Sequence, residues 1–475
     1  MINFNNISFT YENAEEGTLN GISLKINPGE CVLLCGESGC GKTTMIRIMN
    51  GLIPHFYDGE LTGDASVDKL DIRNTPLEKI SGKVGSVFQN PRSQFFCVDT
   101  TGEIAFGPEN MGLPEKEIWE RVHHAVEQLN IQELLNRNIF NLSGGEKQKI
   151  ACAGVSAAQP DIIVLDEPTS NLDEAAIGML KKVLFLWKKS GKTIIIAEHR
   201  LNWLSDLADR VIYMKNGKIA DDLTAKVFFS KSREELNYLG LRSLKETFHY
   251  LEANTGLTPV DSWNSEKFAC GENYILSNFY YKYEKGKEAL HLEPLEIPKH
   301  SVVAVVGHNG AGKSTFSKCL CGIQRGFKGN ITINGKTYKG KKLKKLCYMV
   351  MQDVNHQLFT DSVLEEVSLG FANTPALSAE EVLKKMDLLE LKDRHPMSLS
   401  GGQKQRTAIC SAYLSDRDIL IFDEPTSGLD FKRMQETAEL INEIRKEKTV
   451  FIVTHDMELV EKCCTHILHI ENGRM

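Results

Sequence analysis

Gly36-Glu37-Ser38-Gly39-Cys40-Gly41-Lys42-Thr43 fits the pattern G-x-x-x-x-G-K-[ST], and Gly307-His308-Asn309-Gly310-Ala311-Gly312-Lys313-Ser314 fits it a second time. Each stretch follows a short apolar run, at 31–35 and 302–306, and precedes a segment with helical character. In such a strand, loop and helix arrangement, glycines let backbone N–H groups approach a phosphate at the helix N-terminus. The chain therefore predicts two phosphate-binding loops on one polypeptide.

The chemistry of both loops predicts ATP with Mg²⁺ as the ligand. Lys42 and Lys313 would reach the β- and γ-phosphates, and the hydroxyls of Thr43 and Ser314 would bind Mg²⁺. The loop residues that we expect at the nucleotide are Gly36, Glu37, Ser38, Gly39, Cys40, Gly41, Lys42, Thr43 and Thr44, and Gly307, His308, Asn309, Gly310, Ala311, Gly312, Lys313, Ser314 and Thr315.

Two apolar runs later in the chain each end in a pair of acids, Asp166-Glu167 and Asp423-Glu424. The first acid of each pair is placed to hold Mg²⁺. The second is placed to act as general base toward the attacking water. A strand that simply ends in solvated acids is the alternative, but Pro-Thr-Ser follows both pairs and favours catalysis.

The motifs recur in the same order in two halves, which indicates tandem domains. We expect a first domain over 1–223, a connector over 224–272 and a second domain over 273–475. The start of each half alternates as antiparallel strands do. Continuous apolar runs, which suit buried strands of a mostly parallel sheet, lie at 162–166, 193–197, 419–423 and 449–453.

The connector is interpreted as a short helical segment that packs on one or both halves. Its apolar residues are spaced loosely like a helix face: Leu236, Leu239, Leu241, Leu244, Phe248 and Leu251. The sequence shows no counterpart of this segment after the second half.

A further repeated motif makes a family resemblance specific. Leu142-Ser143-Gly144-Gly145-Glu146-Lys147-Gln148 and Leu399-Ser400-Gly401-Gly402-Gln403-Lys404-Gln405 resemble the signature of ATP-binding cassette ATPases. The resemblance covers nearly all of the chain outside the connector. It implies an α/β fold of tandem P-loop NTPase domains, each with a mostly parallel sheet core, an antiparallel β subdomain and a helical signature subdomain.

The same resemblance implies composite ATP sites, because the family places the signature of one half over the nucleotide of the other. By that rule Lys42 belongs with Ser400 and Gly402. Lys313 belongs with Ser143 and Gly145. The chain would then be an internal pseudo-dimer, with one chain in each transporter.

Other family positions are matched one by one. Gln89 and Gln352 match the Q-loop, which senses Mg²⁺ and the membrane partner, and His199 and His455 match the switch histidine at the γ-phosphate. Asp173 and Asp430 match the D-loop. Both halves keep the loop lysine, the Mg²⁺ acid, the glutamate and the histidine, so the resemblance implies two active sites.

An aromatic platform for adenine is expected at Tyr11 and Tyr283, which precede the two loops at a similar spacing. Phe9, Tyr280 or Tyr281 could be the stacking residue instead. An aromatic residue of the core is the remaining alternative.

Composition excludes several classes of function. The net charge of −7 and the pI near 6.1 argue against a nucleic-acid binder that works by bulk electrostatics. No apolar run approaches the roughly 20 residues of a membrane span, and no secretion leader starts the chain. The 12 cysteines contain no C-x-x-C pair and are interpreted as reduced thiols. We expect a peripheral protein at the cytoplasmic face of the cell membrane.

The segments after the two Q-loop glutamines resemble those of energy-coupling factor importers, which take up vitamins and transition-metal ions. Phe95 and Phe96, and Leu358 and Phe359, are candidates for a surface that docks a membrane subunit or for the core beneath it. The implied partners are a transmembrane coupling subunit and a substrate-binding membrane subunit. The alternatives are the ATPase of a sugar importer and a soluble translation factor that acts on ribosomes.

Overall fold

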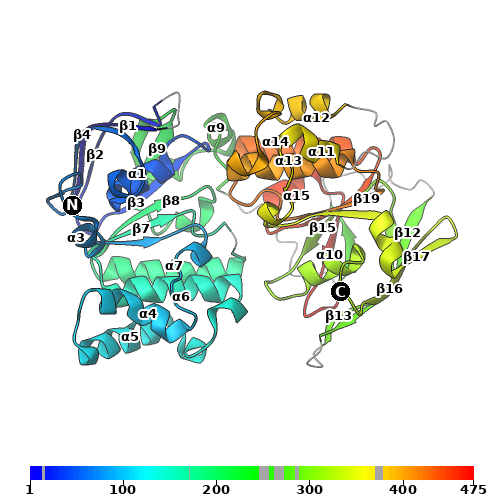
Figure 1. Ribbon diagram of the computed structural model, residues 1–475, viewed down its shortest axis with the longest axis horizontal. Helices are drawn as coiled ribbons and strands as arrows, with labels where there is room; N and C mark the ends of the chain where they lie inside the picture. The colour runs from blue at the N-terminus through cyan, green and yellow to red at the C-terminus, as the bar shows by residue number, and fades with distance from the viewer. Residues whose placement is uncertain (13–16, 171, 245–255, 261–271, 284–287, 370–377) are drawn as a thin grey trace. The chain divides into compact units, whose positions relative to one another are not determined.

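The computed structural model describes residues 1–475 except 13–16, 171, 245–255, 261–271, 284–287 and 370–377. It divides into two compact units, one of residues 1–245 with 430–432 and the other of residues 246–429 with 433–475. Each unit contains one six-stranded sheet and one smaller antiparallel sheet (Figure 1). The repeat of motifs in the sequence is therefore matched by a repeat of architecture, and the α/β fold class is confirmed.

The six-stranded sheet of the first unit is parallel apart from one edge strand. Its order is β10-β9-β3-β8-β7-β6, and only β10 runs antiparallel to its neighbour. Every residue of β3 and β8 is buried, as continuous apolar runs require when both faces of a sheet are covered. The strands are β3 (Cys31–Gly36), β6 (Val84–Val87), β7 (Ile162–Asp166), β8 (Thr193–Ala197), β9 (Arg210–Lys215) and β10 (Lys218–Thr224).

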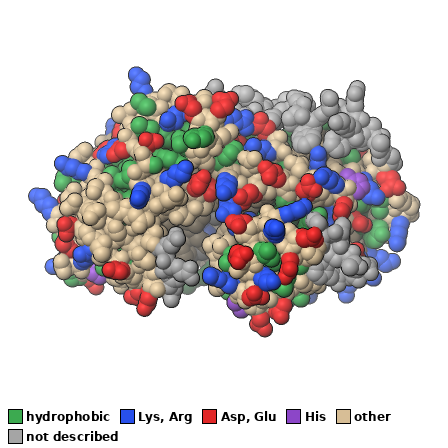
Figure 2. Space-filling model, turned by 90° about the horizontal axis from the view of Figure 1, so that it is seen from above, with side chains coloured by type: hydrophobic (Ala, Val, Ile, Leu, Met, Phe, Trp, Pro, Cys, Tyr) green, Lys and Arg blue, Asp and Glu red, His purple; other side chains and the backbone are tan. Residues whose placement is uncertain are grey.

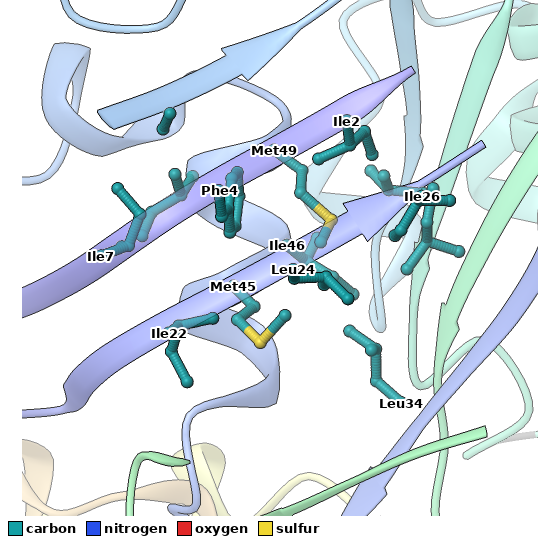
Figure 3. Close-up of a cluster of buried hydrophobic side chains, with 14 of the residues drawn as sticks. Ile2, Phe4, Ile7, Ile22, Leu24, Ile26, Leu34, Met45, Ile46 and Met49 are labelled. Carbon is teal, nitrogen blue, oxygen red and sulfur yellow. The ribbon is translucent and has the colours of Figure 1, made fainter. Parts of the chain in front are cut away.

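The antiparallel sheet of the first unit packs against helix α1, which follows the phosphate loop. Its order is β2-β1-β4-β5, with β1 (Ile2–Tyr11), β2 (Leu19–Ile26), β4 (Gly59–Val67) and β5 (Leu70–Asp71). Figure 3 shows the apolar layer between this sheet and α1 (Lys42–Met49). The labelled side chains are Ile2, Phe4, Ile7, Ile22, Leu24, Ile26, Leu34, Met45, Ile46 and Met49. This layer fixes the helix whose first turn carries Lys42.

The helices of the first unit pack in more than one place, since Ile53 of α2 and Ile80 of α3 join the cluster around α1. α4, α5 and α6 share an apolar cluster that includes Ile104, Val122 and Ile150. The helices are α2 (Leu52–His55), α3 (Leu77–Ser81), α4 (Thr100–Asn110), α5 (Glu115–Leu129), α6 (Gly144–Ala158), α7 (Glu174–Lys189), α8 (Ala225–Phe228) and α9 (Arg233–Tyr238).

The second unit repeats this plan. Its six-stranded sheet has the order β11-β21-β15-β20-β19-β18, with β11 (Gly256–Pro259), β15 (Val302–Val306), β18 (Cys347–Val350), β19 (Ile419–Asp423), β20 (Thr449–Val453) and β21 (His466–His469). Its antiparallel sheet contains β12 (Asn273–Lys282), β13 (Glu288–Leu292), β14 (Leu295–Pro298), β16 (Lys328–Ile333) and β17 (Lys336–Lys339). Its helices are α10 (Lys313–Leu320), α11 (Val363–Ser368), α12 (Ala379–Lys385), α13 (Gly401–Leu414), α14 (Phe431–Ile444) and α15 (Met457–Cys463).

The first part of the 224–272 segment packs on the core of the first unit, and Leu257 packs on that of the second. Phe228, Leu236 and Leu241 are buried in the core of the first unit, and Leu239 and Leu244 pack against it. The expected helix-face positions Phe248 and Leu251 lie outside the described residues.

A strand in this segment went unpredicted. β11 pairs antiparallel with β21 and takes the edge position that β10 holds in the first sheet. Its Pro259 is tolerated because an edge strand needs ladder donors on one side only.

Among the described residues, no helix is long and apolar enough to cross a membrane.

Candidate nucleotide-binding sites

The two phosphate loops have the same geometry. Each loop connects a buried strand to a helix whose first residue is the lysine, Lys42 of α1 or Lys313 of α10. The Lys42 ammonium donates to the carbonyl oxygens of Gly36 and Glu37, both at 2.9 Å. The Lys313 ammonium donates to those of Gly307 at 2.6 Å and His308 at 3.1 Å. Each cation is thus held inside the ring of backbone where phosphate oxygens would bind.

The expected Mg²⁺ ligands lie side by side in each unit. The Thr43 hydroxyl donates to Asp166 Oδ1 at 3.1 Å, and Ser314 makes the same kind of hydrogen bond to Asp423. Burial raises the pKa of Asp166 to about 6 and that of Asp423 to about 6. A hydroxyl and a carboxylate, with phosphate oxygens and water, are the oxygen ligands that Mg²⁺ takes at nucleotide sites. The residues fit the ion.

The second acid of each pair follows its strand in a left-handed conformation, with φ of 44° at Glu167 and 51° at Glu424. The Glu167 N–H donates to the carbonyl oxygen of Ala197 in the neighbouring strand, and the Glu424 N–H donates to that of Val453, both at 2.8 Å. These bonds turn both carboxylates in the same way at the carboxyl ends of β7 and β19.

Glu167 has partners that suit a general base. Its Oε2 accepts from Gln89 Nε2 at 2.8 Å, and its Oε1 lies 3.3 Å from His199 Nε2. Burial raises the pKa of Glu167 to about 7. A carboxyl group with a pKa near neutrality can accept a proton from water far more readily than an ordinary glutamate.

In the second unit, Glu424 Oε1 lies 3.8 Å from His455 Nε2, so the acid and histidine are again neighbours. His455 Nε2 also lies 3.1 Å from Lys313 Nζ and 3.2 Å from Asn309 Oδ1. Gln352 is exposed at the end of β18. The structure therefore gathers the loop, the acids and the histidine within each unit, as the sequence predicts.

Two buried acids beside the histidines were not anticipated. The Thr169 hydroxyl donates to Glu198 Oε2 at 2.6 Å, and the Thr426 hydroxyl donates to Asp456 Oδ2 at 2.7 Å. Glu198 precedes its histidine in the sequence, whereas Asp456 follows its histidine. The signal was present as an acid next to each histidine. It was easily missed because the acid changes side between the halves.

The signature serines begin helices. Ser143 is the N-cap of α6 and Ser400 is the N-cap of α13, each in a capping box that is closed by Glu146 or Gln403. A helix N-terminus with two glycines in its first turn leaves backbone N–H groups accessible to an anion. The pairing of each signature with the loop of the other half stays a prediction.

Tyr11 and Tyr283 hold equivalent positions at the edge of the loops. The Tyr11 hydroxyl lies 3.3 Å from Thr44 Oγ1, and the Tyr283 hydroxyl lies 3.2 Å from Thr315 Oγ1. Of the alternative residues, Phe9 and Tyr281 are buried in the apolar cores, and Tyr280 is half-buried with its ring against His291. The geometry favours Tyr11 and Tyr283 as the adenine platforms, which remain a proposal.

Replacing Tyr11 with Ala should raise the KM for ATP about tenfold, because stacking of a base on an aromatic ring contributes about 1–3 kcal/mol. Tyr11→Phe keeps the ring and should change KM by less than about threefold. The measurement is steady-state ATPase activity against ATP concentration. Equal losses in Tyr11→Ala and Tyr11→Phe would show that the hydroxyl contacts, rather than stacking, set the affinity.

Comparison with known proteins assigns the family. The model of the ABC transporter family matches residues 19–170 and again residues 292–427. A Treponema denticola protein named as an ABC transporter ATP-binding protein is 45% identical over 100% of this chain and 96% of its own length. Bacillus subtilis YkoD, named as an HMP/thiamine import ATP-binding protein, is 33% identical over 98% of this chain and 89% of its own length.

A solved structure supports the same fold. A structure of ribosome-bound archaeal Pelota and ABCE1 contains a chain that superposes on this one with a TM-score of 0.67 at 22% identity. The match covers 98% of this chain and 77% of that chain. Identity at this level speaks for the fold alone. With both family matches, both sets of motifs and this architecture, the chain belongs to the ABC transporter ATP-binding family and is an ATPase with two cassettes.

Proposed function

We propose that this ATPase powers a membrane importer of the energy-coupling factor type, which takes up a vitamin or a transition-metal ion. It would act at the cytoplasmic face of the membrane with a transmembrane coupling subunit and a substrate-binding membrane subunit. The likeness to YkoD, which is named for import, supports this class.

The hydrolytic step follows from the site geometry. Glu167 and Glu424 would each accept a proton from a water whose oxygen attacks the γ-phosphorus, as the bond to the ADP oxygen breaks. Lys42 and Lys313 would bind the β- and γ-phosphate oxygens. Mg²⁺, held at Asp166 and Asp423 with the adjacent hydroxyls, would neutralise charge on the phosphates.

Closure of two composite sites would couple this chemistry to transport. Ser400 and Gly402 would complete the site of Lys42, and Ser143 and Gly145 would complete the site of Lys313. ATP binding would close the two cassettes and hydrolysis would open them, so that the membrane subunits move with each cycle.

The observation that carries the membrane proposal is an exposed aromatic residue at the same place in each unit. Phe96 is 75% exposed and Phe359 is 74% exposed. The preceding residue of each pair lies in the core instead, since Leu358 is buried and Phe95 packs on the apolar cluster of α4–α6. Phe95 and Leu358 therefore belong to the core, and the exposure of Phe96 and Phe359 supports the proposal that they form the docking surface.

In each unit a buried glutamate carboxylate hydrogen-bonds to the backbone of the exposed phenylalanine and of the residue after it. Glu103 Oε2 accepts from the backbone N–H groups of Phe96 and Cys97 at 2.9 and 2.8 Å. Glu366 Oε2 accepts from those of Phe359 and Thr360 at 2.9 and 3.0 Å. The Phe96 ring stacks on Phe106 with centroids 4.9 Å apart and remains largely exposed. Exposed aromatic side chains on a fixed backbone are typical of an interface.

In each unit a second glutamine, Gln94 or Gln357, follows the Q-loop glutamine and hydrogen-bonds to the backbone on the other side of the turn. Gln94 Oε1 accepts from Phe88 N–H at 3.3 Å, while its Nε2 donates to Ser86 O at 2.9 Å. Gln357 repeats both bonds with Met351 and Met349, at 3.1 and 3.0 Å. The Q-loop and the exposed aromatic residue are thus parts of one fixed turn, which supports coupling between the nucleotide and a partner.

A second apolar residue lies exposed in the loop before each signature. Phe140 is 77% exposed, and Met397 at the equivalent place is 47% exposed. The surface in Figure 2 carries Lys, Arg, Asp and Glu side chains interspersed over the visible face, without one broad basic area.

Replacing both Phe96 and Phe359 with Asp should remove at least about 90% of the membrane proteins that purify with the tagged chain in mild detergent, because truncating central apolar anchors costs about 2 kcal/mol or more each. Basal ATP hydrolysis by the isolated chain should persist. Tyr238→Asp, at an exposed residue of α9, is the control. Purification of ribosomal proteins in place of small membrane subunits would contradict the importer proposal.

A further inference from the structure

A cavity of about 330 Å³ lies between α6 and α7 of the first unit, beside the turn that ends α5. The two helices pack side by side (Figure 1). Helix α6 contributes Gln148 and Cys152 to the wall of the cavity, and α7 contributes Leu180 and Val183. The volume lies within the range of small-molecule sites and equals that of roughly ten water molecules.

The inner wall of this cavity is apolar. Leu180 and Val183 are buried in the core of the first unit. Burial raises the pKa of the Cys152 thiol to about 12, as apolar surroundings do to a group that would become charged. Met179 and Leu186 continue the apolar lining to the surface, since they are 38% and 39% exposed. A ligand held here would gain most of its affinity by burying hydrocarbon.

The polar part of the lining carries positive charge. Lys149 is half-buried and Lys182 is exposed, and neither ammonium has an ion-pair or hydrogen-bond partner in the part of the chain that the structure describes. Gln148 is 4% exposed, and its Nε2 is buried without a hydrogen-bond partner among the described residues. None of the described residues that line the cavity is acidic. A hydrocarbon wall with nearby cations and an amide suits an anion that has an apolar body.

The second unit has an ion-pair network at the equivalent place. The Arg433 guanidinium lies 2.9 Å from Glu436 Oε2 and 3.4 Å from Asp387 Oδ2. Counted from the signature serines, the first unit has an uncharged residue at each of these three positions, and all three line the cavity: Ala176, Met179 and Asn130. The arginine of the second unit thus spans the place that is hollow in the first.

We propose that the cavity between α6 and α7 binds a small amphipathic carboxylate, with a hydrocarbon chain of about ten carbons. The chain would lie against Leu180 and Val183. The carboxylate would face Lys149 and Lys182, and one of its oxygens would supply the acceptor that the Gln148 amide lacks. The site belongs to the first unit, because ion-paired side chains take its place in the second.

The probe is decanoate, and decylammonium is its counterpart with the same chain and the opposite charge. Binding of each to the full chain without nucleotide is measured by isothermal titration calorimetry, below the concentration at which a blank titration shows micelles. Decanoate should bind one to one with a Kd below about 1 mM, and decylammonium at least about tenfold more weakly. Equal affinities, or no saturable binding of decanoate, would overturn the inference.

The double variant Lys149→Gln, Lys182→Gln tests the charge. It should weaken decanoate binding about tenfold and leave decylammonium binding no weaker. The matched control is Lys189→Gln, Lys218→Gln, at two exposed lysines outside the lining, which should change the decanoate affinity by less than about twofold. A loss in the control as large as that in the test variant would show general attraction of an anion and would contradict the site.

The double variant Ala176→Arg, Met179→Glu tests the cavity. It copies the ion pair that the second unit already holds and leaves the net charge unchanged. Decanoate binding should weaken by more than about tenfold, because the new side chains occupy the space of the ligand. Ala176→Met fills part of the same space without charge and carries the test if the double variant fails to unfold cooperatively on heating. Undiminished decanoate binding in a folded variant with the filled cavity would eliminate the site.

This binding site does not depend on the importer proposal. The titrations use the isolated chain without nucleotide or membrane, so failure of the importer proposal would leave their outcome unchanged. Failure of decanoate to bind would in turn leave the ATP sites and the membrane partners untouched.

Discussion

Replacing both Glu167 and Glu424 with Gln should lower the turnover of ATP by about 10²–10⁴-fold while ATP binding persists. The amide is close in size to the carboxylate, so the left-handed turn and the backbone bonds to Ala197 and Val453 can remain. An amide cannot accept the proton of the attacking water. The measurements are phosphate release under saturating ATP and equilibrium binding of ATP to the same protein.

The matched control is the double variant Glu133→Gln, Glu390→Gln. Glu133 and Glu390 are exposed and hold equivalent positions in the two units. The control changes the net charge by the same amount and should leave turnover unchanged. Single replacements of Glu167 or Glu424 show whether each site can work when its counterpart is silent. Undiminished hydrolysis in the double variant would eliminate these glutamates as general bases.

Replacing Gly36 or Gly307 with Ala should abolish nucleotide binding at the altered loop and destabilise its unit by about 3 kcal/mol or more. Both glycines have φ near +150°, at +150° and +148°. A Cβ atom would lie 2.3 Å from Met214 O in the first unit and 2.0 Å from Ile470 O in the second. Backbone carbonyls cannot move aside as a flexible side chain can, so the loop itself must shift.

Gly39→Ala and Gly310→Ala provide the comparison within the same loops. Their φ values are +79° and +89°, but a Cβ atom at either place would meet nothing within 4 Å. The expected cost is the strain of a left-handed conformation, about 1 kcal/mol. Thermal unfolding and ATP titration measure both effects. A loss of stability at Gly39 as large as at Gly36 would show that conformation, rather than the carbonyl contact, dominates.

The parts of the fold that the sequence predicts are those with strong local signals. The runs at 162–166 and 419–423 are strands at those same residues, because unbroken apolar sequence suits a strand covered on both faces. The loop lysines and the acids could be located because phosphate and Mg²⁺ chemistry restricts the residue types and their spacing.

The parts that the sequence does not predict depend on distant contacts. β11 is four residues long and ends in proline, so nothing local marks it as a strand before β21 supplies its partner. The burial of Leu358 and the exposure of Phe359 could not be told apart from the sequence, since both residues are apolar. The Phe359 N–H donates to Glu366, a contact between residues that no local pattern predicts.

The edge strand β11 also has a consequence for how the chain folds. The first sheet closes its edge with a local hairpin, in which Lys218 pairs with Lys215. The second sheet pairs Gly256 with His469, so β11 leaves the ribosome long before its partner strand exists. Throughout that interval β11 is an unpaired edge able to associate with other chains. The edge of the second sheet therefore forms only after about 200 further residues have been made, whereas the edge of the first sheet forms within a single hairpin.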